Sequence, residues 1–478
     1  MTMSTQPPNI IAIIGGGFSG AALAWHLLKG PRVPLTVLVF EPRSVLGSGV
    51  AYSATDPNHR INVPASRMSI DTAHPLDFLE WLEETGANHQ DDGARQPDGN
   101  LYPARKVFGQ YVAARLAPLL EAHLLRHIPS LVTAARKVST GKWILETQGG
   151  DVFEADTVVI ATSHPAPQLP RQFAALGAFL SAETRPVLIN DPWKPDGLST
   201  VKPDDRVLII GTGLSMADTV ASLAAQGHRA PILAISRRGQ RSKSHSRTPV
   251  TATGDFLSPP ASRTRDVLQR IRKIIADNPD TPWQAFLDRV REQGPQIWSS
   301  LDQTERRRLI RHLRPFWDTH RFRISPQTEN IVNKALQAGI LQIKAARVIK
   351  VEKEGKTFKV TLRLRNGHTD DRVVDAIITT TGPAHVNILH SQPFLKSLAA
   401  EGHIEMDPSD LGLHVSAEGN AQVGPQKDPS LFVAGPLARG RFGELMGLPE
   451  VTLYAERLAN TIRAQTAMPV PENATLIS

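Results

Sequence analysis

Two glycine-rich turns in the sequence have the spacing of a dinucleotide phosphate site. The first contains Gly15, Gly17 and Gly20 and lies between an apolar run and a stretch rich in alanine and leucine. In such a turn the first glycine permits a tight bend, the second lets the pyrophosphate approach the backbone, and the third lets the helix pack on the strand. The N–H groups at the start of the helix then face the phosphates. We predict that Phe18 and Ser19, inside this turn, also belong to the cofactor site.

An acidic residue follows the first turn at the distance that a ribose site requires. Glu41 closes the next apolar run, Leu35–Phe40, and comes 21 residues after Gly20. A carboxylate at the end of this strand can accept hydrogen bonds from both ribose hydroxyls. The combination of strand, turn, helix and acid favours a dinucleotide site over an ordinary glycine turn.

The second turn is followed by a different kind of residue. Gly211 and Gly213 begin this turn, and Ala217 takes the place of the third glycine, which the fingerprint permits. The next strand ends in Arg237 and Arg238 instead of an acid. Two guanidinium groups match a 2′-phosphate with paired N–H donors, so NADPH is favoured over NADH. The alternative is that both arginines coat a solvated surface. The predicted residues of this site are Gly211, Gly213, Leu214, Ser215, Arg237 and Arg238.

The order of the strands and helices around the two turns predicts the fold. Each turn lies in a strand–helix–strand unit, and the first unit and the late strands bracket the second unit. We therefore predict an α/β protein with two Rossmann-like dinucleotide-binding domains, in which an FAD domain is interrupted by an NADPH domain. The first turn, with its acidic ribose acceptor, suits FAD, and the second suits the nucleotide that reduces it. The predicted domains are a first FAD-binding part at 1–165, an NAD(P)H-binding domain at 166–385 with a helical insertion at about 255–330, and a last FAD-binding part at 386–478.

The composition excludes several functions. The 478 residues include no cysteine, which excludes a dithiol–disulfide mechanism and a thiolate metal site. The net charge of +8 suits a cleft for diphosphates, and the basic clusters lack the interleaved aromatic residues of a single-strand binder, so no nucleic-acid partner is expected. No apolar run is long enough to span a membrane and the start does not resemble a signal peptide, so we expect a cytoplasmic protein without a membrane partner. His123 and His127 are four residues apart on a predicted helix, but no acidic partner accompanies them, and no metal site is predicted.

Several further stretches together resemble one known family. They are Gly47–Tyr52, Asn62–Ala65, Asp191–Trp193, Ser236–Gly239, Trp317–Arg321 and Gly435–Gly440. With the two glycine turns, they resemble a bacterial family of FAD/NAD(P)-binding proteins related to the flavin-dependent N-hydroxylating monooxygenases. The resemblance covers residues 9–460, nearly the whole chain. The resemblance is specific enough to predict the fold and the cofactors, but it does not identify the substrate.

The resemblance implies roles for residues outside the two turns. Arg105 matches a basic position near the flavin in the family. Asn62 and Pro64 match a loop that passes close to the isoalloxazine ring. Gly435 takes the place of the late FAD motif, in which aspartate usually follows the glycine, whereas this chain has Pro436. This departure argues against a direct carboxylate contact with the FAD ribityl chain at that place.

These parts predict an FAD- and NADPH-dependent monooxygenase. NADPH would reduce FAD, and the reduced flavin would react with molecular oxygen to a peroxyflavin that hydroxylates the nitrogen of a small amine or amino acid. Hydrogen bonds to the flavin and correct placement carry such a reaction, and Asn62 and Ser215 are the predicted catalytic contacts near the ring. Two alternatives stay open: an FAD-dependent NAD(P)H reductase or dehydrogenase, and a non-enzymatic flavin redox sensor.

A group of basic residues in the predicted helical region is the candidate substrate anchor. His320, Arg321 and Arg323, together with Arg311 and Arg314, would hold the carboxylate of an amino acid. The alternative is a solvated basic helix face. The identity of the substrate, the oligomeric state and the role of the basic loop 240–248 stay open at this point.

Overall fold

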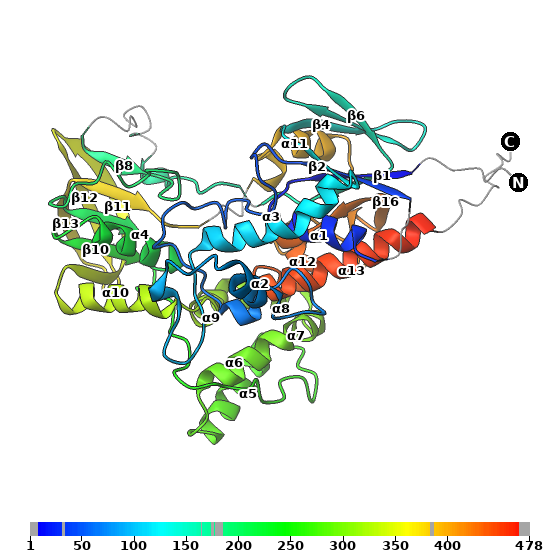
Figure 1. Cartoon of the computed structure of the whole chain (residues 1–478). Helices are drawn as coiled ribbons and strands as arrows, with labels where there is room; N and C mark the ends of the chain where they lie inside the picture. Colours follow the sequence, from blue (N-terminus) through cyan, green and yellow to red (C-terminus); the bar gives the residue numbers. More distant parts are fainter. Residues whose placement is uncertain are drawn as a thin grey trace, which may run out of the picture.

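The structure contains two large sheets with helices around them and a helical part beside them (Figure 1). The computed structural model describes residues 8–30, 34–163, 165–173, 176, 185–382 and 387–467. Among these residues, one sheet has six strands, a second has seven and a third has three. The two large sheets lie toward opposite sides of the view in Figure 1, and helices α5 to α7 extend below them.

The six-stranded sheet carries the first glycine turn. Its strands, in spatial order, are β15 (Asn420–Val423), β16 (Gln426–Val433), β7 (Thr157–Ile160), β1 (Asn9–Ile14), β2 (Leu35–Phe40) and β3 (Leu125–Ile128). Strand β1 pairs in parallel with β2 on one side and β7 on the other. These strands are nearly continuous apolar runs, as expected for a parallel sheet that is covered on both faces. Helix α1 (Phe18–Leu28) follows the turn and packs along α13 (Leu448–Ala467).

The seven-stranded sheet repeats this arrangement around the second turn. Its strands, in spatial order, are β13 (Thr369–Val374), β12 (Thr357–Leu364), β11 (Leu341–Glu354), β10 (Ile232–Ser236), β9 (Val207–Ile210), β14 (Ala376–Thr379) and β8 (Val187–Ile189). Strand β9 lies between β10 and β14 and is parallel to both, as β1 is to β2 and β7. Helix α4 (Leu214–Ala225) follows β9 and packs with α10 (Pro326–Gln337).

The order of these strands along the chain shows one fold interrupted by another. Strands β1, β2, β3 and β7 precede the second sheet, while β15 and β16 follow it. Strand β16 returns to pair in parallel with β7, with Leu431 opposite Val158. The small third sheet, β4 (Val132–Lys137), β5 (Trp143–Thr147) and β6 (Val152–Ala155), is antiparallel and packs with α11 (Pro393–Ala400). The predicted α/β class with two Rossmann-like units is thus confirmed.

The helical insertion, predicted at about 255–330, is a set of short helices. The helices in this stretch are α5 (Thr264–Asp277), α6 (Trp283–Glu292), α7 (Gly294–Ser300), α8 (Gln303–His312) and α9 (Arg314–Arg321). Asp302 caps α8 by accepting a hydrogen bond from the Glu305 N–H at 2.8 Å. Pro295 and Pro315 lie in the first turns of α7 and α9. Proline starts a helix readily and cannot continue one, so these residues divide the region.

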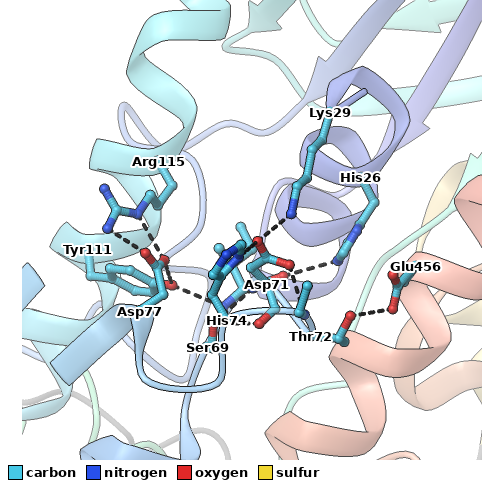
Figure 2. Close-up of polar contacts among 12 residues, drawn as sticks. His26, Lys29, Ser69, Asp71, Thr72, His74, Asp77, Tyr111, Arg115 and Glu456 are labelled. Atoms are coloured by element: carbon cyan, nitrogen blue, oxygen red, sulfur yellow. Dashed lines mark hydrogen bonds and ion pairs between the residues drawn. The ribbon is translucent and has the colours of Figure 1, made fainter. Parts of the chain in front are cut away.

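A polar network fixes the loop that leads into α2 (Asp77–Thr85), as Figure 2 shows. Asp71 accepts hydrogen bonds from Lys29, the C-cap of α1, and from His74 Nδ1 at 2.7 Å. Asp77 forms an ion pair with Arg115 of α3 (Arg105–Glu121), with an Oδ1–Nη2 distance of 2.6 Å. The loop is therefore fastened to two helices of the first unit by charged contacts.

The helix that was predicted to carry His123 and His127 ends before both of them. Helix α3 ends at Glu121, His123 has a φ of +56°, and His127 lies in β3, where its Nε2 donates to the Glu41 carbonyl O at 2.8 Å. The placement of the two histidines on one helix face was therefore wrong. In the part of the chain that the structure describes, no three His, Asp or Glu side chains come together as metal ligands. The described helices also include none with the length and apolar character needed to cross a bilayer.

Candidate functional site

The first glycine turn is closed by contacts that leave no space for side chains. Gly15 has a φ of +109°, and a Cβ there would lie 2.7 Å from the carbonyl O of Ala161, which follows β7. A Cβ at Gly20 would lie 2.0 Å from the carbonyl O of Gly15, so α1 packs directly on the turn. A Cβ at Gly17, the N-cap of α1, would meet the Cα of Gly49 at 3.4 Å. The turn therefore needs glycine and presents free N–H groups at a helix start.

Two elements that are distant in sequence complete the surroundings of this turn. The buried Glu41 carboxylate accepts hydrogen bonds from the Gly16 N–H at 3.1 Å and from Arg43 Nη1 at 2.9 Å. Gly435, with a φ of +70°, lies so close to α1 that a Cβ would be 2.3 Å from the Ser19 Oγ. The structure thus brings together the carboxylate, the late glycine and the first turn.

The second turn has the same backbone shape and more open surroundings. Gly211 has a φ of +124°, and a Cβ there would lie 2.4 Å from the Oγ1 of Thr380, which follows β14. A Cβ at Gly213 would meet no atom within 4 Å. Met216, three residues after Gly213 as Gly20 is after Gly17, is buried, so α4 accommodates a large side chain where α1 requires a glycine. The prediction that Ala217 takes this position was wrong by one residue. The second turn therefore offers open space directly at the start of its helix.

The end of strand β10 differs from the end of β2 in charge. Ser236 stands where the first unit has its carboxylate, and its Oγ accepts a hydrogen bond from Thr212 Oγ1 at 2.8 Å. Arg237 and Arg238 follow and are exposed. The Arg238 guanidinium lies 4.5 Å from the ring centre of Phe316 in α9. A neutral strand end with two guanidinium groups attracts a 2′-phosphate, which a carboxylate would repel.

A cavity of about 1230 Å³ lies between the two glycine-turn units and the helical insertion. This volume exceeds that of an ordinary small-molecule pocket and suits a nucleotide together with a second ligand. The predicted site residues that line it are Asn62, Arg105, Gly211, Gly213, Leu214, Ser215, Arg237, Arg238 and Arg321. The other predicted site residues lie outside its lining, and they are Gly15, Gly17, Phe18, Ser19, Gly20, Glu41, Pro64, Gly435, His320 and Arg323.

His320 and Arg323 point away from this cavity, so the predicted substrate anchor needs correction. Helix α9 ends at Arg321, and the chain then turns so that Arg323 is buried against α6 and pairs with Asp288 at 2.8 Å. His320 Nδ1 donates to the Phe316 carbonyl O at 2.7 Å, within its own helix. The three residues were expected to form one anchor, but His320 and Arg323 both lie against the ring of Trp283 in α6, at 5.1 Å and 5.3 Å from its centre. Of the three, Arg321 lines the cavity.

Arg105 joins the two units across the cavity wall. Its Nη2 donates to Asp218 of α4 at 2.8 Å, and its Nε donates to the Arg60 carbonyl O at 2.9 Å. Its guanidinium also lies 4.5 Å from the ring centre of Trp193. Burial raises the pKa of the Asp218 carboxyl, and the positive charge of Arg105 opposes this shift. An ion pair from α3 to α4 thus fixes how the second turn faces the first unit.

A second contact between the two units lies one turn further along α4. Ser222 Oγ donates to Asp56 Oδ2 at 2.5 Å and lies 3.0 Å from His59 Nε2. Burial lowers the pKa of His59, which keeps its imidazole neutral near pH 7. The sequence analysis missed Asp218 and Ser222. Their signal was present, because they are polar residues four positions apart in a helix of mostly apolar residues.

The surroundings of both turns fit nucleotide cofactors. Thr162 Oγ1, in the segment against Gly15, and Gln240 Oε1, in the cavity wall, are buried and have no hydrogen-bond partner among the described residues. Buried polar atoms in proteins are nearly always paired, so such atoms mark places for the polar groups of a ligand. The open space at Gly213 is a further feature of a phosphate cradle.

Comparisons with known proteins agree with this geometry. Residues 12–165 match a family model described as FAD-NAD(P)-binding. A comparison with curated protein sequences gives no match. The fold is similar to that of reduced ornithine hydroxylase from Pseudomonas aeruginosa, with 18% identity, a TM-score of 0.64 and coverage of 96% of this chain and 100% of that chain.

Two further solved structures show the range of similar proteins. Ornithine N-hydroxylase from Kutzneria sp. 744, solved with reduced FAD, NADP⁺ and L-ornithine, has 17% identity, a TM-score of 0.63 and coverage of 96% of this chain and 100% of that chain. Bacillithiol disulfide reductase from Staphylococcus aureus has 15% identity, a TM-score of 0.53 and coverage of 96% and 99%. The predicted resemblance to N-hydroxylating monooxygenases is confirmed at the level of the fold.

The fold and the two turns define a flavoprotein with two dinucleotide-binding units. Its N-terminal segment, residues 12–165, is an FAD-NAD(P)-binding domain. The predicted flavin and nicotinamide cofactors agree with this family model, and the chain shares its fold with the similar enzymes.

Proposed function

We propose that the protein is an FAD- and NADPH-dependent monooxygenase that hydroxylates the nitrogen of a small amine or amino acid. The observation that carries the proposal is that Asn62 and Arg105 of the first unit line the same cavity as Ser215 of the second turn. A cavity of this kind lets a nicotinamide, a flavin and a substrate meet. The fold shared with two ornithine hydroxylases supports this type of reaction.

In this proposal FAD lies along the first turn and NADPH along the second. Glu41 would accept the ribose hydroxyls of FAD, while Arg237 and Arg238 would bind the 2′-phosphate of NADPH. When bound, FAD would supply the redox chemistry, namely acceptance of a hydride from NADPH and transfer of one oxygen atom of O₂ to the substrate, with the other oxygen atom released as water. The residues proposed for FAD are Gly15, Gly17, Phe18, Ser19, Gly20, Glu41, Pro64, Arg105 and Gly435, and those proposed for NADPH are Gly211, Gly213, Leu214, Ser215, Arg237 and Arg238.

The chain's own residues position the reactants and limit the access of water. The backbone of Asn62 is held in place because its carbonyl O accepts a hydrogen bond from His245 Nε2 at 3.0 Å. Burial lowers the pKa of His245 to about 4, so its ring is neutral near pH 7. The apolar side chains of Ile61 and Val63 flank Asn62 in the same wall. The Asn62 carboxamide and the Ser215 hydroxyl would therefore act as hydrogen-bond contacts in a site shielded from water.

A reductase that transfers electrons without oxygenation is the second candidate. The similar fold of a bacillithiol disulfide reductase supports it. Because this chain has no cysteine, electrons would have to pass from the flavin to the acceptor without a thiol relay. A flavin redox sensor, which would bind NADPH without steady turnover, is the third candidate.

Isotope labelling separates these functions. The FAD-loaded protein is incubated with NADPH, ¹⁸O₂ and a panel of amines and amino acids, and both NADPH oxidation and product mass are measured. We expect one labelled oxygen atom in a hydroxylamine product for each NADPH consumed. NADPH oxidation that depends on an added electron acceptor, with no labelled product from any amine, would contradict the proposal and support the reductase.

A further inference from the structure

The loop that follows β10 lies directly against strand β11. Within the loop, the Gly239 N–H donates to the Ser236 Oγ at 3.0 Å, so the chain curls back on the end of its own strand. Gly239 has a φ of +63°, and a Cβ there would lie 2.8 Å from the backbone N of Ala345 in β11. This close approach fixes the loop, and with it Arg237 and Arg238, beside β11.

The hairpin of β11 and β12 carries three arginines at this place. Arg347 of β11 is directly opposite Arg363 of β12, and Arg365 directly follows the end of β12. Because side chains alternate between the two faces of a strand, Arg347 lies on the face opposite its neighbour Ala346, which packs in the core. Arg347 and Arg365 line the large cavity, as do the two arginines after β10.

The register of the parallel strands places Arg347 beside the loop. Ser236, the last residue of β10, pairs with Ala345 of β11. Arg238 and Arg347 each come two residues after this pair. They therefore lie at the same level of the sheet, just past the carboxyl end of β10. Ligands of doubly wound sheets bind at this edge.

The arginines in this part of the cavity have no acidic partner. Within the part of the chain that the structure describes, the side chains of Arg237, Arg347 and Arg365 form no ion pair and no hydrogen bond. Arg238 contacts the aromatic ring in α9 and no carboxylate among the same residues. Four guanidinium groups from two chain segments thus line one cavity with their N–H donors unused.

Two charges of the hairpin also repel each other in the ligand-free protein. Arg347 and Arg363 form a directly opposed cross-strand pair, and like charges in such a pair are destabilising. Asp370 of the next strand does not relieve this repulsion, because it pairs with Lys344 at 3.8 Å and with Arg372 at 2.7 Å. A bound anion would offset the repulsion. Guanidinium groups bind phosphate with paired N–H donors, so a phosphate group is the expected ligand.

We propose that Arg347 and Arg365 bind the 2′-phosphate of NADPH from the side of the hairpin. Arg237 and Arg238 would bind the same phosphate from the side of the loop after β10. This inference rests on the proposed use of NADPH and adds two specificity-determining residues from a distant part of the sequence. The preference for NADPH over NADH then depends on the hairpin as well as on the strand end.

Nucleotide pairs that differ only in the 2′-phosphate test the proposal. NADP⁺ and NAD⁺, and likewise 2′,5′-ADP and AMP, are titrated into the FAD-loaded protein by calorimetry. Arg347→Gln combined with Arg365→Gln is expected to raise the Kd of NADP⁺ and of 2′,5′-ADP at least about tenfold, because two charge-assisted contacts are lost. The Kd of NAD⁺ and of AMP should change less than about twofold, because neither has the 2′-phosphate.

Arg363→Gln is the matched control. It removes the same charge from the same hairpin, but Arg363 does not belong to the cavity lining. We expect this control to change the Kd of NADP⁺ less than about twofold. The melting temperature of the nucleotide-free protein is the second measurement. Arg347→Gln removes one of two opposed like charges and should not lower it, whereas loss of a merely structural residue would.

Each outcome decides between distinct conclusions. Equal rises in the Kd of NADP⁺ and NAD⁺, or no rise for either, overturn the proposal. A rise in the control as large as in the double variant would show a general effect of positive charge and overturn it too. If the double variant loses its fold, Arg365→Gln alone is used, because Arg365 is exposed.

The same titrations separate this inference from the proposed reaction. A wild-type protein that binds NAD⁺ as tightly as NADP⁺ would overturn both the hairpin site and the use of NADPH. A selective loss of NADP⁺ affinity in the double variant, together with no labelled hydroxylamine from any amine in the wild type, would support the hairpin site and reject the N-hydroxylation.

Discussion

The two glycine turns share a backbone design and differ in what surrounds it. In the first turn the Gly15 N–H donates to the Phe40 carbonyl O at 2.9 Å, and in the second the Gly211 N–H donates to the Ile235 carbonyl O at 2.8 Å. Both first glycines lie against the segment that follows a neighbouring parallel strand. The residue after these carbonyls is Glu41 in one unit and Ser236 in the other. The turn would therefore bind the diphosphate that all dinucleotides share. The residue at the strand end would distinguish a ribose with free hydroxyls from a ribose with a 2′-phosphate.

The helices after the turns differ in how closely they pack. A Cβ at Gly20 would lie 2.0 Å from a backbone oxygen, whereas Met216, at the equivalent position of α4, carries a buried side chain. The first helix is thus bound to its turn by a contact that tolerates no side chain.

The largest effect is expected from a change at the first turn. Gly15→Val would introduce a side chain at a φ of +109° and against the Ala161 carbonyl O, so the turn cannot keep its shape. We expect a protein that contains no FAD after desalting, measured as flavin absorbance per protein. Gly213→Ala, where a Cβ meets no atom within 4 Å, is the matched control and should retain its flavin. A yellow Gly15→Val protein would contradict the placement of FAD at the first turn.

Removal of the Asp218 carboxylate tests whether the two units are locked together. Asp218→Ala would leave the guanidinium of Arg105 unpaired in a place where both side chains are nearly buried. We expect the free energy of unfolding to fall by about 3 kcal/mol, because one partner of a buried ion pair is lost. The control, Asp204→Ala, breaks a pair with Arg229 in which both side chains are 69% exposed. The loss of unfolding free energy in this control should stay below about 1 kcal/mol in the same urea titration. Equal losses in the two variants would contradict the stabilising role of the ion pair between Arg105 and Asp218.

The strand-end difference predicts a cofactor preference. Arg237→Ala combined with Arg238→Ala should raise the KM for NADPH roughly tenfold to a hundredfold, since each charge-assisted contact contributes about 1.5–3 kcal/mol when shielded and less when exposed. The KM for NADH should change little, because NADH has no 2′-phosphate. Steady-state kinetics with both nucleotides measures the ratio. A parallel rise for NADPH and NADH would remove the 2′-phosphate assignment.

The last comparison concerns a pH dependence at the contact between the units. The pKa of His245 falls from 6.5 to about 4 in the folded state because of burial. The unfolded chain therefore binds a proton between these values while the folded protein does not. Stability should be highest above pH 6.5, and it should fall as the pH drops toward about 4. His245→Gln should flatten the dependence of the unfolding midpoint on pH in this window, and an unchanged slope would exclude His245 as its source.

Much of the fold was predictable from the sequence, because local patterns determine it. The glycine spacing, the apolar runs and Glu41 predicted both strand–helix–strand units, and the late strands predicted the interruption. The domain limits at 165 and 385 stay a proposal, supported by the sheets, since β7 ends at Ile160 and β15 begins at Asn420. These features depend on neighbours in sequence, on the tight turn that glycine permits and on the burial of parallel strands.

Only the tertiary structure decided which charged residues share the cavity. His320, Arg321 and Arg323 are close in sequence, yet the end of α9 sends Arg321 to the cavity and buries Arg323 against Asp288. Arg291, in α6, lines the same cavity as Arg321. The pairing of Arg105 with its carboxylate in α4 likewise links two units. Sequence spacing determines a turn because its atoms are adjacent, whereas the packing of short helices decides which side chains meet.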